Sequence, residues 1–275
     1  MQIRNEIGPV WHLTEIDFTA IRKEWVRQDE DLFYLLASAS FVEILSELYA
    51  QNLIDHYQGD DQVVRWLKNQ WQREEVQHGH AFKAYVQAVW PEFDWDAAYA
   101  DFVREYSALC TVEELEPSQA LEMAARCVVE TGTATFYQSL THYTREPVLR
   151  QILANIKSDE VRHFTEFRHH FRKYNREEAK NAWQVGRAMW RRMGEIRGED
   201  SYIAFKHVYA WRNPGWPFED KIWRHFLRKL NSLARINYPY RMAIDMLLAP
   251  LALSRFAKRL LRPPLFVLAR YALFR

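Results

Sequence analysis

The sequence predicts an all-α protein whose main part is an antiparallel four-helix bundle with additional N-terminal and C-terminal helices. Three observations lead to this fold class. Apolar residues recur at helical spacing from Asp31 to about Phe171. The 275 residues include only 8 Gly and 10 Pro, too few for a β-sandwich with many turns. The 11 Trp, 14 Tyr and 16 Phe supply large rings for packing between helices.

Breaks in the apolar periodicity divide this region into helices. The long helices are predicted at 31–57, 61–89, 118–143 and 147–174, with a shorter one at 95–110. Asp61 and Ser118 are suitable N-caps, and Pro147 fits a first helical turn. Further helices are predicted at 14–28, 177–197, 216–234 and 239–262.

Composition divides the chain into four parts. These are an N-terminal segment at 1–30, the helical bundle at 31–175, additional helices at 176–220, and a basic amphipathic segment at 221–275. The last boundary follows "WRNPGWPFED", the clearest turn in the chain. The basic segment carries twelve Lys and Arg and a single acid, Asp245, whereas residues 1–220 carry 25 basic and 35 acidic residues. The two regions therefore differ strongly in charge.

Two Glu-x-x-His motifs interrupt apolar helix faces. Glu75 and His78 share a face with Val64, Leu67, Trp71, Phe82, Tyr85 and Val89. Glu160 and His163 share a face with Leu149, Ile152, Ile156, Phe167 and Phe171. A charge on such a face is costly unless it is paired or bound to a metal. A third match, Glu166 to His169, lies with Asp159, Arg162 and Lys173 on a charged face and is interpreted as solvated.

Two other helices each offer a carboxylate in an apolar stretch. Glu130 follows Met123 and Cys127 and precedes Ala134 and Tyr137 at helical spacing. On the first helix, Glu43 and Glu47 both lie on a similar face. We prefer Glu43, because its spacing to Tyr49 roughly resembles that of Glu130 to Tyr137, and Glu47 is the alternative.

The four carboxylates and two histidines repeat along the chain. Corresponding residues in the two halves are offset by 85 to 87 positions. One Glu from each of two helices and a Glu-x-x-His from each of two others form the ligand set of di-iron and di-manganese carboxylate bundles. Four carboxylates would neutralise two divalent cations in an apolar core.

Three segments resemble the ferritin-like di-iron carboxylate superfamily, with a local likeness to acyl-carrier-protein desaturases and related di-iron oxygenases. They are "WQREEVQHG" (71–79), "VVETGTATFYQ" (128–138) and "SDEVRH" (158–163). The resemblance covers about residues 31–175. It implies one iron held by Glu43, Glu75 and His78 and another held by Glu130, Glu160 and His163, with Glu75 and Glu160 as bridges. It also implies that Glu74 and Asp159 accept hydrogen bonds from the ring N–H groups of the histidines.

The resemblance further implies a non-haem di-iron oxidoreductase, an oxygenase (monooxygenase) or oxidase. Such an enzyme uses O2 to hydroxylate, desaturate or otherwise oxidise a substrate, and takes two electrons from a reductase as external electron donor. Because the bundle is apolar and aromatic, we expect a hydrophobic substrate, acyl or lipid-like. Manganese suits the same ligands. The alternative is a ferritin-like protein that oxidises and stores iron or scavenges peroxide, but about 100 residues follow the bundle and favour an enzyme.

Other residues near the motifs have simpler interpretations. Thr133, three residues after Glu130, is a candidate catalytic residue that faces an oxygen-binding pocket, and a structural role in its helix is the alternative. Four aromatic residues are predicted to pack in the core, with a role as electron-transfer or radical residues as the alternative: Trp66, Trp71, Tyr85 and Tyr137. Three histidines are predicted to be exposed: His80, His169 and His170.

Cysteine use and the N-terminus predict a cytoplasmic protein. Cys110 and Cys127 lie in helical segments and give no disulfide framework, which indicates a reducing compartment. The start, "MQIRNEIGPVWHL", lacks the basic and apolar regions of a signal peptide.

Residues 241–275 mix Leu-rich stretches with Arg and Lys and are broken by Pro250, Pro263 and Pro264. No apolar run approaches the roughly 20 residues that span a bilayer. This composition suits peripheral binding to an anionic membrane surface or docking of an acidic partner. Packing against the acidic body or a homodimer interface is the alternative. Nucleic acid is disfavoured as a partner, because Leu and Phe dominate over polar residues.

Overall fold

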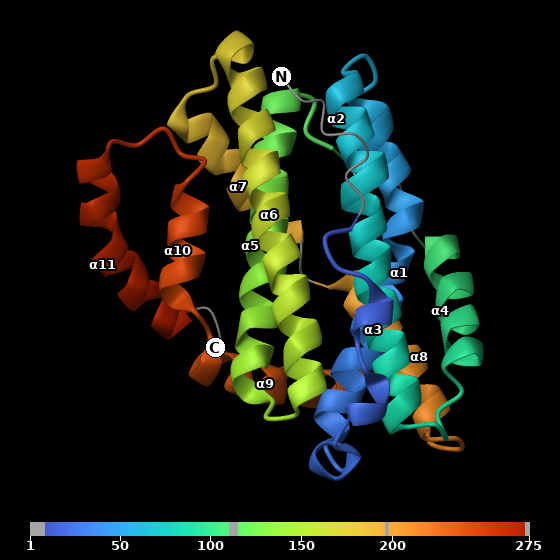
Figure 1. Cartoon of the computed structure of the whole chain (residues 1–275). Coiled ribbons are helices and arrows are strands. Elements are labelled where there is room, and N and C mark those ends of the chain that lie inside the picture. The colour runs from blue at the N-terminus through green and yellow to red at the C-terminus, as the bar shows by residue number, and fades with distance from the viewer. Residues whose placement is uncertain (1–8, 110–114, 196–197, 273–275) are drawn as a thin grey trace. The chain divides into compact units, whose positions relative to one another are not determined.

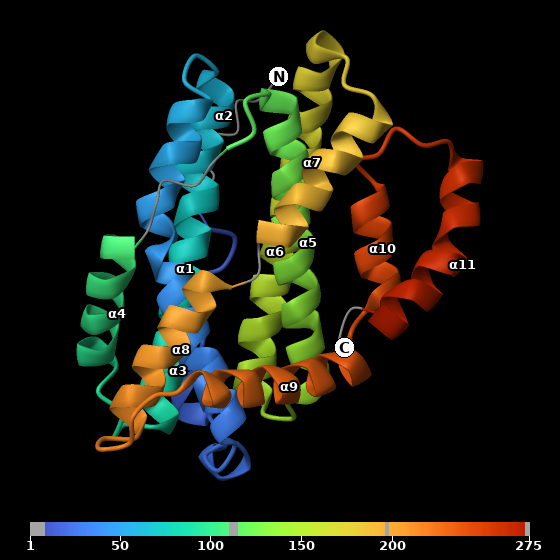
Figure 2. The same ribbon diagram turned by 180° about the vertical axis from the view of Figure 1, so that it is seen from behind.

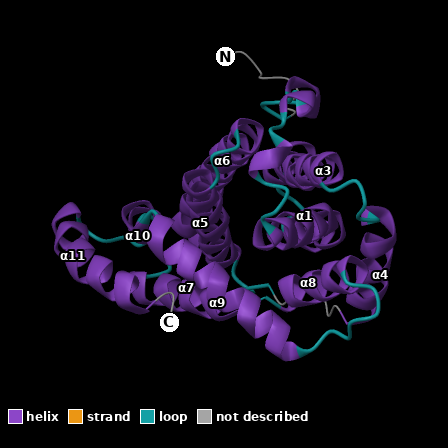
Figure 3. Ribbon diagram, turned by 90° about the horizontal axis from the view of Figure 1, so that it is seen from below, coloured by secondary structure: helices purple, strands orange, loops and turns teal. Residues whose placement is uncertain are grey.

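The computed structural model describes residues 9–109, 115–195 and 198–272, apart from the side chains of residues 47–49, 109 and 272. Every regular element in these ranges is a helix, which confirms the all-α fold class (Figure 3). The described residues form two compact units. The first unit takes its residues from 1–113, 145–152 and 198–229, and the second from 114–144, 153–197 and 230–275. The units combine segments distant in sequence, and the four predicted parts of the chain stay a prediction.

In the first unit, α1 (Glu30–His56) and α3 (Gln72–Val89) lie side by side (Figures 1 and 3). α2 (Asp61–Trp66) continues into α3 through a π-helical turn, η4 (Leu67–Trp71). α8 (Glu199–Arg212) contacts both α1 and α4 (Trp95–Leu109). The helices predicted at 31–57, 61–89 and 95–110 are therefore confirmed.

α8 was missed by the sequence prediction. Ile203, Ala204, Phe205 and Val208 form its buried side. Aromatic residues also occur on the rest of the helix, and they hide the apolar period that would have indicated it.

The helix predicted at 14–28 is wrong. Three short 3-10 turns occupy this region: η1 (Leu13–Glu15), η2 (Phe18–Ala20) and η3 (Lys23–Trp25). The buried residues here recur every five positions, which does not match a helix: Trp11, Ile16, Ile21 and Val26. The Asp17 carboxylate also accepts a hydrogen bond from the Thr19 N–H, a local contact that competes with helix formation.

The predicted helix starts are confirmed in two of three cases. Asp60, and not Asp61, caps α2, because the Asp60 carboxylate accepts the hydrogen bond from the Val63 N–H at 3.3 Å. The Ser118 Oγ accepts from the Leu121 N–H at 3.1 Å, as predicted for an N-cap. Pro147 is the first residue of its helix, also as predicted.

The second unit is built around α5 (Gln119–Tyr143) and α6 (Pro147–Glu178), of which α6 contributes its residues from Leu153 onward. α7 (Ala182–Glu195) and α10 (Tyr240–Leu248) contact α5, and α11 (Arg255–Ala272) contacts α10 (Figure 2). α9 (Asp220–Asn237) enters this unit at Leu230.

The single helix predicted at 239–262 is wrong. The chain instead forms α10 and α11, with a break that contains Pro250. A proline removes a backbone hydrogen bond and disfavours helical geometry at the residue before it. The helix is therefore interrupted near Pro250, although the apolar pattern continues on both sides of the interruption.

α1 is the one helix among the described residues that is long and apolar enough to cross a membrane by length and composition. Of the apolar stretch in this helix, 73% is buried in the structure. Such burial is what a core helix of a soluble protein shows.

Gly79 marks a close approach of α3 to α1. A Cβ at this position would lie 2.5 Å from Ile44 Cγ1, 2.7 Å from Ile44 N and 2.9 Å from Ser40 O. Two of these three atoms belong to backbone, which cannot move aside as a flexible side chain can. Because Gly79 directly follows His78 and Ile44 directly follows Glu43, this contact sets the spacing of two candidate ligands.

We expect Gly79→Ala to lower the free energy of unfolding by about 1–3 kcal/mol, because the added methyl group overpacks the α1–α3 contact. Gly132→Ala on α5 is the matched control, since a Cβ there meets nothing within 4 Å. Replacing a glycine inside a helix where there is space should stabilise the protein by about 0.5–1 kcal/mol. Denaturant unfolding of both variants measures the difference, and equal effects would contradict the close approach.

Candidate functional site

The first candidate site lies in the first unit and consists of Glu43 on α1 with Glu75 and His78 on α3. We call it the Glu43 triad. One ligand atom from each residue lies within 4.8 Å of the others, and all three side chains are buried. The apolar face predicted around Glu75 and His78 is confirmed by the burial of Leu67, Trp71, Phe82, Tyr85 and Val89. Val64, which precedes the π-helical turn, is only half-buried, and Val63 is buried in its place. The side chain of Glu47, the alternative to Glu43, lies outside the described residues.

Trp11 supports the Glu43 triad from the N-terminal segment. Its ring stacks on the His78 imidazole, with centroids 6.4 Å apart and planes 5° apart. Its carbonyl oxygen accepts a hydrogen bond from Gln77 Nε2 at 2.9 Å. The sequence did not indicate this role of Trp11, because Trp11 lies in a non-helical segment. No local sequence pattern predicts that this segment packs against α3.

The second candidate site lies in the second unit and consists of Glu130 on α5 with Glu160 and His163 on α6. We call it the Glu130 triad. Its ligand atoms also lie within 4.8 Å of one another, and each residue is at most 2% exposed. His163 Nδ1 is 3.5 Å from Glu130 Oε2 and 3.9 Å from Glu160 Oε2, so this ring nitrogen faces both carboxylates.

The apolar faces predicted around the Glu130 triad are confirmed. On α6 the buried residues are Leu149, Ile152, Ile156, Phe167 and Phe171, and on α5 they are Met123, Cys127, Ala134 and Tyr137. Helical spacing therefore placed both Glu130 and the Glu160–His163 pair on inward faces, as the sequence indicated.

Burial governs the electrostatics of the Glu130 triad. It raises the pKa of Glu130 to about 8, an effect that the charge of Glu160 reinforces and the hydrogen bond from His163 opposes. Burial, and then the charge of Glu130, raises the pKa of the Cys127 thiol, so this thiol stays protonated. Cys110 lies outside the described residues.

Thr133 contacts one of the candidate ligands directly. Its hydroxyl lies 2.7 Å from Glu160 Oε2, the shortest of three possible acceptor contacts, the others being the carbonyl oxygens of Val129 at 3.3 Å and Glu130 at 3.2 Å. A hydroxyl has a single proton, so donation to Glu160 is favoured by distance and by the charge of the acceptor. That Thr133 faces an oxygen-binding pocket stays a prediction.

Glu74 and Asp159, which precede the two motif glutamates, are both buried. Gln70 Nε2 lies 3.5 Å from Glu74 Oε1, and Arg162 donates to Asp159 Oδ1 at 2.7 Å. The prediction that Asp159 lies on a charged, solvated face is wrong, because this side chain is 1% exposed and its charge is paired with Arg162. The predicted hydrogen bonds from the histidine rings to Glu74 and Asp159 stay a prediction.

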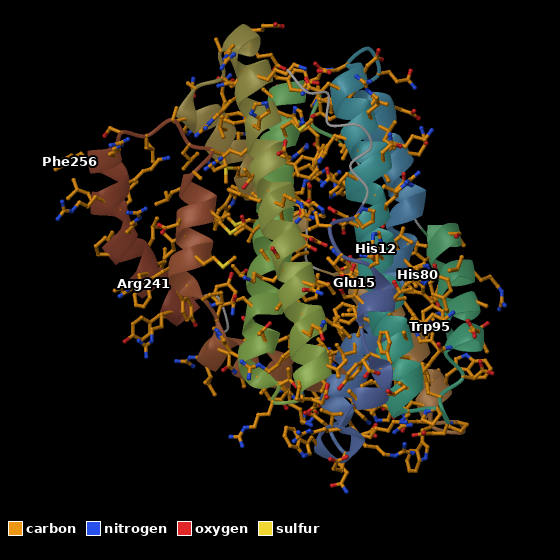
Figure 4. The ribbon with its side chains drawn as sticks, in the orientation of Figure 1. His12, Glu15, His80, Trp95, Arg241 and Phe256 are labelled. Carbon is orange, nitrogen blue, oxygen red and sulfur yellow. The ribbon has the colours of Figure 1, made fainter. Side chains whose placement is uncertain are left out.

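The histidine predictions are confirmed for His80 and His169, which are exposed, and wrong for His170, which is 2% exposed. His170 extends the line of His163 and Phe167 at helical spacing, so it faces inward. His80 is labelled in Figure 4 on α3, two residues beyond the buried His78. The core prediction is confirmed for Trp71, Tyr85 and Tyr137, whereas Trp66 is only partly buried.

Each triad has the composition of a divalent metal site. Two carboxylates and a neutral imidazole carry a charge of about −2, which one divalent cation neutralises. Oxygen and imidazole nitrogen ligands suit iron, manganese and zinc. No protein-family model, curated protein or solved structure matches this chain, so its function is inferred from these residues.

We expect the metal-free protein to lose stability as pH rises from about 4.5 to about 8. The folded pKa of Glu130 is about 8 and its ordinary value is 4.5, so in this window the folded state holds a proton that the unfolded chain has released. Thermal unfolding after chelation measures the slope. Glu130→Gln, which cannot ionise, should flatten it, and an unchanged slope in this variant would assign the effect to another group.

We expect Thr133→Val to weaken metal binding about 10- to 100-fold, because a hydrogen bond that orients a ligand carboxylate is lost while the side-chain shape is kept. Thr133→Ser retains the hydroxyl and should bind nearly as the wild type. Competition with a chelator for Mn²⁺ gives the affinities. Equal affinities for the Val and Ser variants would show that the hydroxyl does not act on Glu160.

Proposed function

We propose that the chain is a non-haem di-metal oxidoreductase in which each triad holds one iron and O2 oxidises an organic substrate. The observation that supports this proposal is the repetition of one buried donor set. Each triad combines a Glu from one helix with a Glu-x-x-His from another, and corresponding residues lie 85 to 87 positions apart. A single buried triad would have several explanations, but its repetition in the same order matches a two-metal carboxylate protein.

Iron fits this donor set, and manganese is the alternative. Bound iron would supply the electrons that dioxygen reduction requires, and an external reductase would restore them. The ferritin-like antiparallel bundle, with α1, α3, α5 and α6 as its helices, is part of the proposal. So are the bridging roles of Glu75 and Glu160.

The residues around the triads would keep the reaction dry and the ligands oriented. Phe82 on α3 and Phe167 on α6 are buried on the ligand faces, and exclusion of water strengthens electrostatic interactions. Trp11 limits the rotation of the His78 ring by stacking, and Thr133 orients Glu160 through its hydroxyl. Glu130 holds a proton near neutral pH in the metal-free state, so metal binding would release it.

The surroundings also suggest the kind of substrate and the compartment. The ligand-bearing faces are lined by Leu, Ile and aromatic residues, which favours a hydrophobic substrate, acyl or lipid-like. The buried free thiol of Cys127 suits a reducing compartment, and we propose a cytoplasmic location.

Anaerobic titration with ferrous iron tests the proposal. We expect saturation at about two ions per chain, as the repeated donor set requires. Glu43→Gln and Glu160→Gln each remove one carboxylate from one triad, and each should reduce the bound iron by at least one ion. A loss of one ion indicates independent sites, and a loss of both indicates a shared cluster.

Glu166→Gln is the matched control, because this glutamate belongs to the third Glu-x-x-His match and lies partly exposed on α6. It should bind iron as the wild type does. Oxygen consumption by the loaded protein with an artificial reductant then separates the classes of function. Iron uptake far beyond two ions per chain would favour storage. If the wild type binds no more iron than a double variant, Glu43→Gln and Glu160→Gln, the metal site is contradicted.

A further inference from the structure

α11 carries a row of large apolar side chains that point away from the rest of the second unit. Phe256, labelled in Figure 4 at the start of the helix, is 71% exposed, and Leu268 is 61% exposed. At 100° per residue, the exposed apolar residues fall within an arc of roughly 140°. They are Phe256, Leu260, Leu261, Val267, Leu268 and Tyr271.

The cations of α11 are Arg255, Lys258, Arg259, Arg262 and Arg270, and the helix contains no acidic residue. At 100° per residue all five lie outside the apolar arc, and Arg259 and Arg270 border it at about 60° and 40° from Phe256. Arg168 and Arg172 of α6 lie close enough to act on Lys258: burial first, and then these two arginines and Arg262, lower the pKa of Lys258. Positive charge therefore accumulates around α11.

α11 is attached to the second unit through its non-apolar side. Arg262 donates to Asp245 of α10 at 2.6 Å, and Lys258 Nζ donates to the Ala249 carbonyl oxygen at 3.4 Å. The Phe266 ring, on the same side, packs edge-on against Tyr240 at 5.8 Å. An amphipathic helix of a soluble protein normally turns its apolar face toward the core. Here this orientation is reversed.

We propose that α11 docks on an anionic phospholipid surface. Its apolar arc would enter the boundary between headgroups and acyl chains, and the flanking cations would contact the lipid phosphates. The helix would lie in the plane of the surface, because it has 18 residues with five cations and two prolines and cannot span a bilayer. The proposal does not depend on metal binding by the triads.

Charge complementarity favours an anionic phospholipid surface over a second copy of the chain as the partner of α11. Two α11 apolar faces brought together would bring the bordering cations Arg259 and Arg270 of both helices close to one another without acids between them. An anionic membrane supplies both an apolar layer and the negative charge, and each cation near such a surface adds to the affinity. Residues 221–275 as a whole carry twelve Lys and Arg against one acid.

Flotation of the full chain with lipid vesicles tests the proposal. We expect recovery with phosphatidylcholine vesicles that contain phosphatidylglycerol, little recovery with phosphatidylcholine alone, and a decrease as salt is added. A triple variant, Phe256→Gln, Leu260→Gln and Leu268→Gln, should bind anionic vesicles at least about tenfold more weakly, because it removes three large apolar side chains from the membrane-facing arc.

A second triple variant changes charge alone. Arg255→Gln, Arg259→Gln and Arg270→Gln should weaken binding at least about 25-fold, since Arg259 and Arg270 border the apolar arc and each cation near an anionic surface contributes about fivefold. Trp216→Gln is the matched control, because Trp216 is 72% exposed and lies in the first unit. It should bind as the wild type, and circular dichroism should show unchanged helix content in all variants.

Three outcomes would overturn the proposal. They are absence of vesicle binding by the wild type, equal recovery on both vesicle types, and unchanged binding by both triple variants. Sedimentation of the lipid-free protein provides the remaining comparison. A dimer that the apolar variant dissociates, without any vesicle binding, would assign the face to a second copy of the chain.

Discussion

The cost of burying carboxylates is the constraint on which the candidate sites depend. α5 shows it clearly, because it carries two buried glutamates with opposite behaviour. Burial opposes ionisation of Glu122, but Arg126 and Arg192 lower its pKa, and both arginines donate to its oxygens. Glu130, two turns further along, instead has its pKa raised by burial and by Glu160. Glu122 carries its charge with protein cations, whereas Glu130 needs a proton or a metal ion.

Structural ion pairs and close helix contacts fix the helices within each unit, so that the ligands of each triad meet. In the second unit, the ion pair between Glu122 and Arg192 joins α5 to α7. In the first unit, the Glu146 carboxylate accepts hydrogen bonds from the Tyr85 hydroxyl at 3.0 Å and the Leu149 N–H at 2.7 Å, which joins α3 to the start of α6. Such buried polar contacts fix geometry more than they add stability. Gly79 also fixes geometry, because its lack of a side chain lets α1 pack directly against the turn of α3 that carries the candidate ligands.

The sequence predicted the parts that depend on helical periodicity. The long helices and the inward faces of Glu75, His78, Glu130, Glu160 and His163 follow from the spacing of apolar residues, and the structure bears these out. Helical periodicity does not predict contacts between segments that are distant in sequence. The stacking of Trp11 on His78 depends on which segment covers α3, which no local pattern states. The burial of His170 was instead indicated by its helical spacing from His163 and Phe167, a signal that the prediction of an exposed side chain overlooked. Turn chemistry accounts for the error at 14–28, where side-chain hydrogen bonds compete with the helix.

The division of the two triads between two units has a physical consequence. Each unit contributes two carboxylates and one imidazole, so each could neutralise one divalent cation with its own residues. A ligand that binds only the folded state stabilises it in proportion to the logarithm of its concentration over the dissociation constant. Metal bound to the Glu43 triad would therefore stabilise the α1–α3 pair, and metal bound to the Glu130 triad would stabilise the α5–α6 pair. Because the donor set of each triad joins two helices, a metal ion would act as a crosslink within its unit as well as a reactive centre.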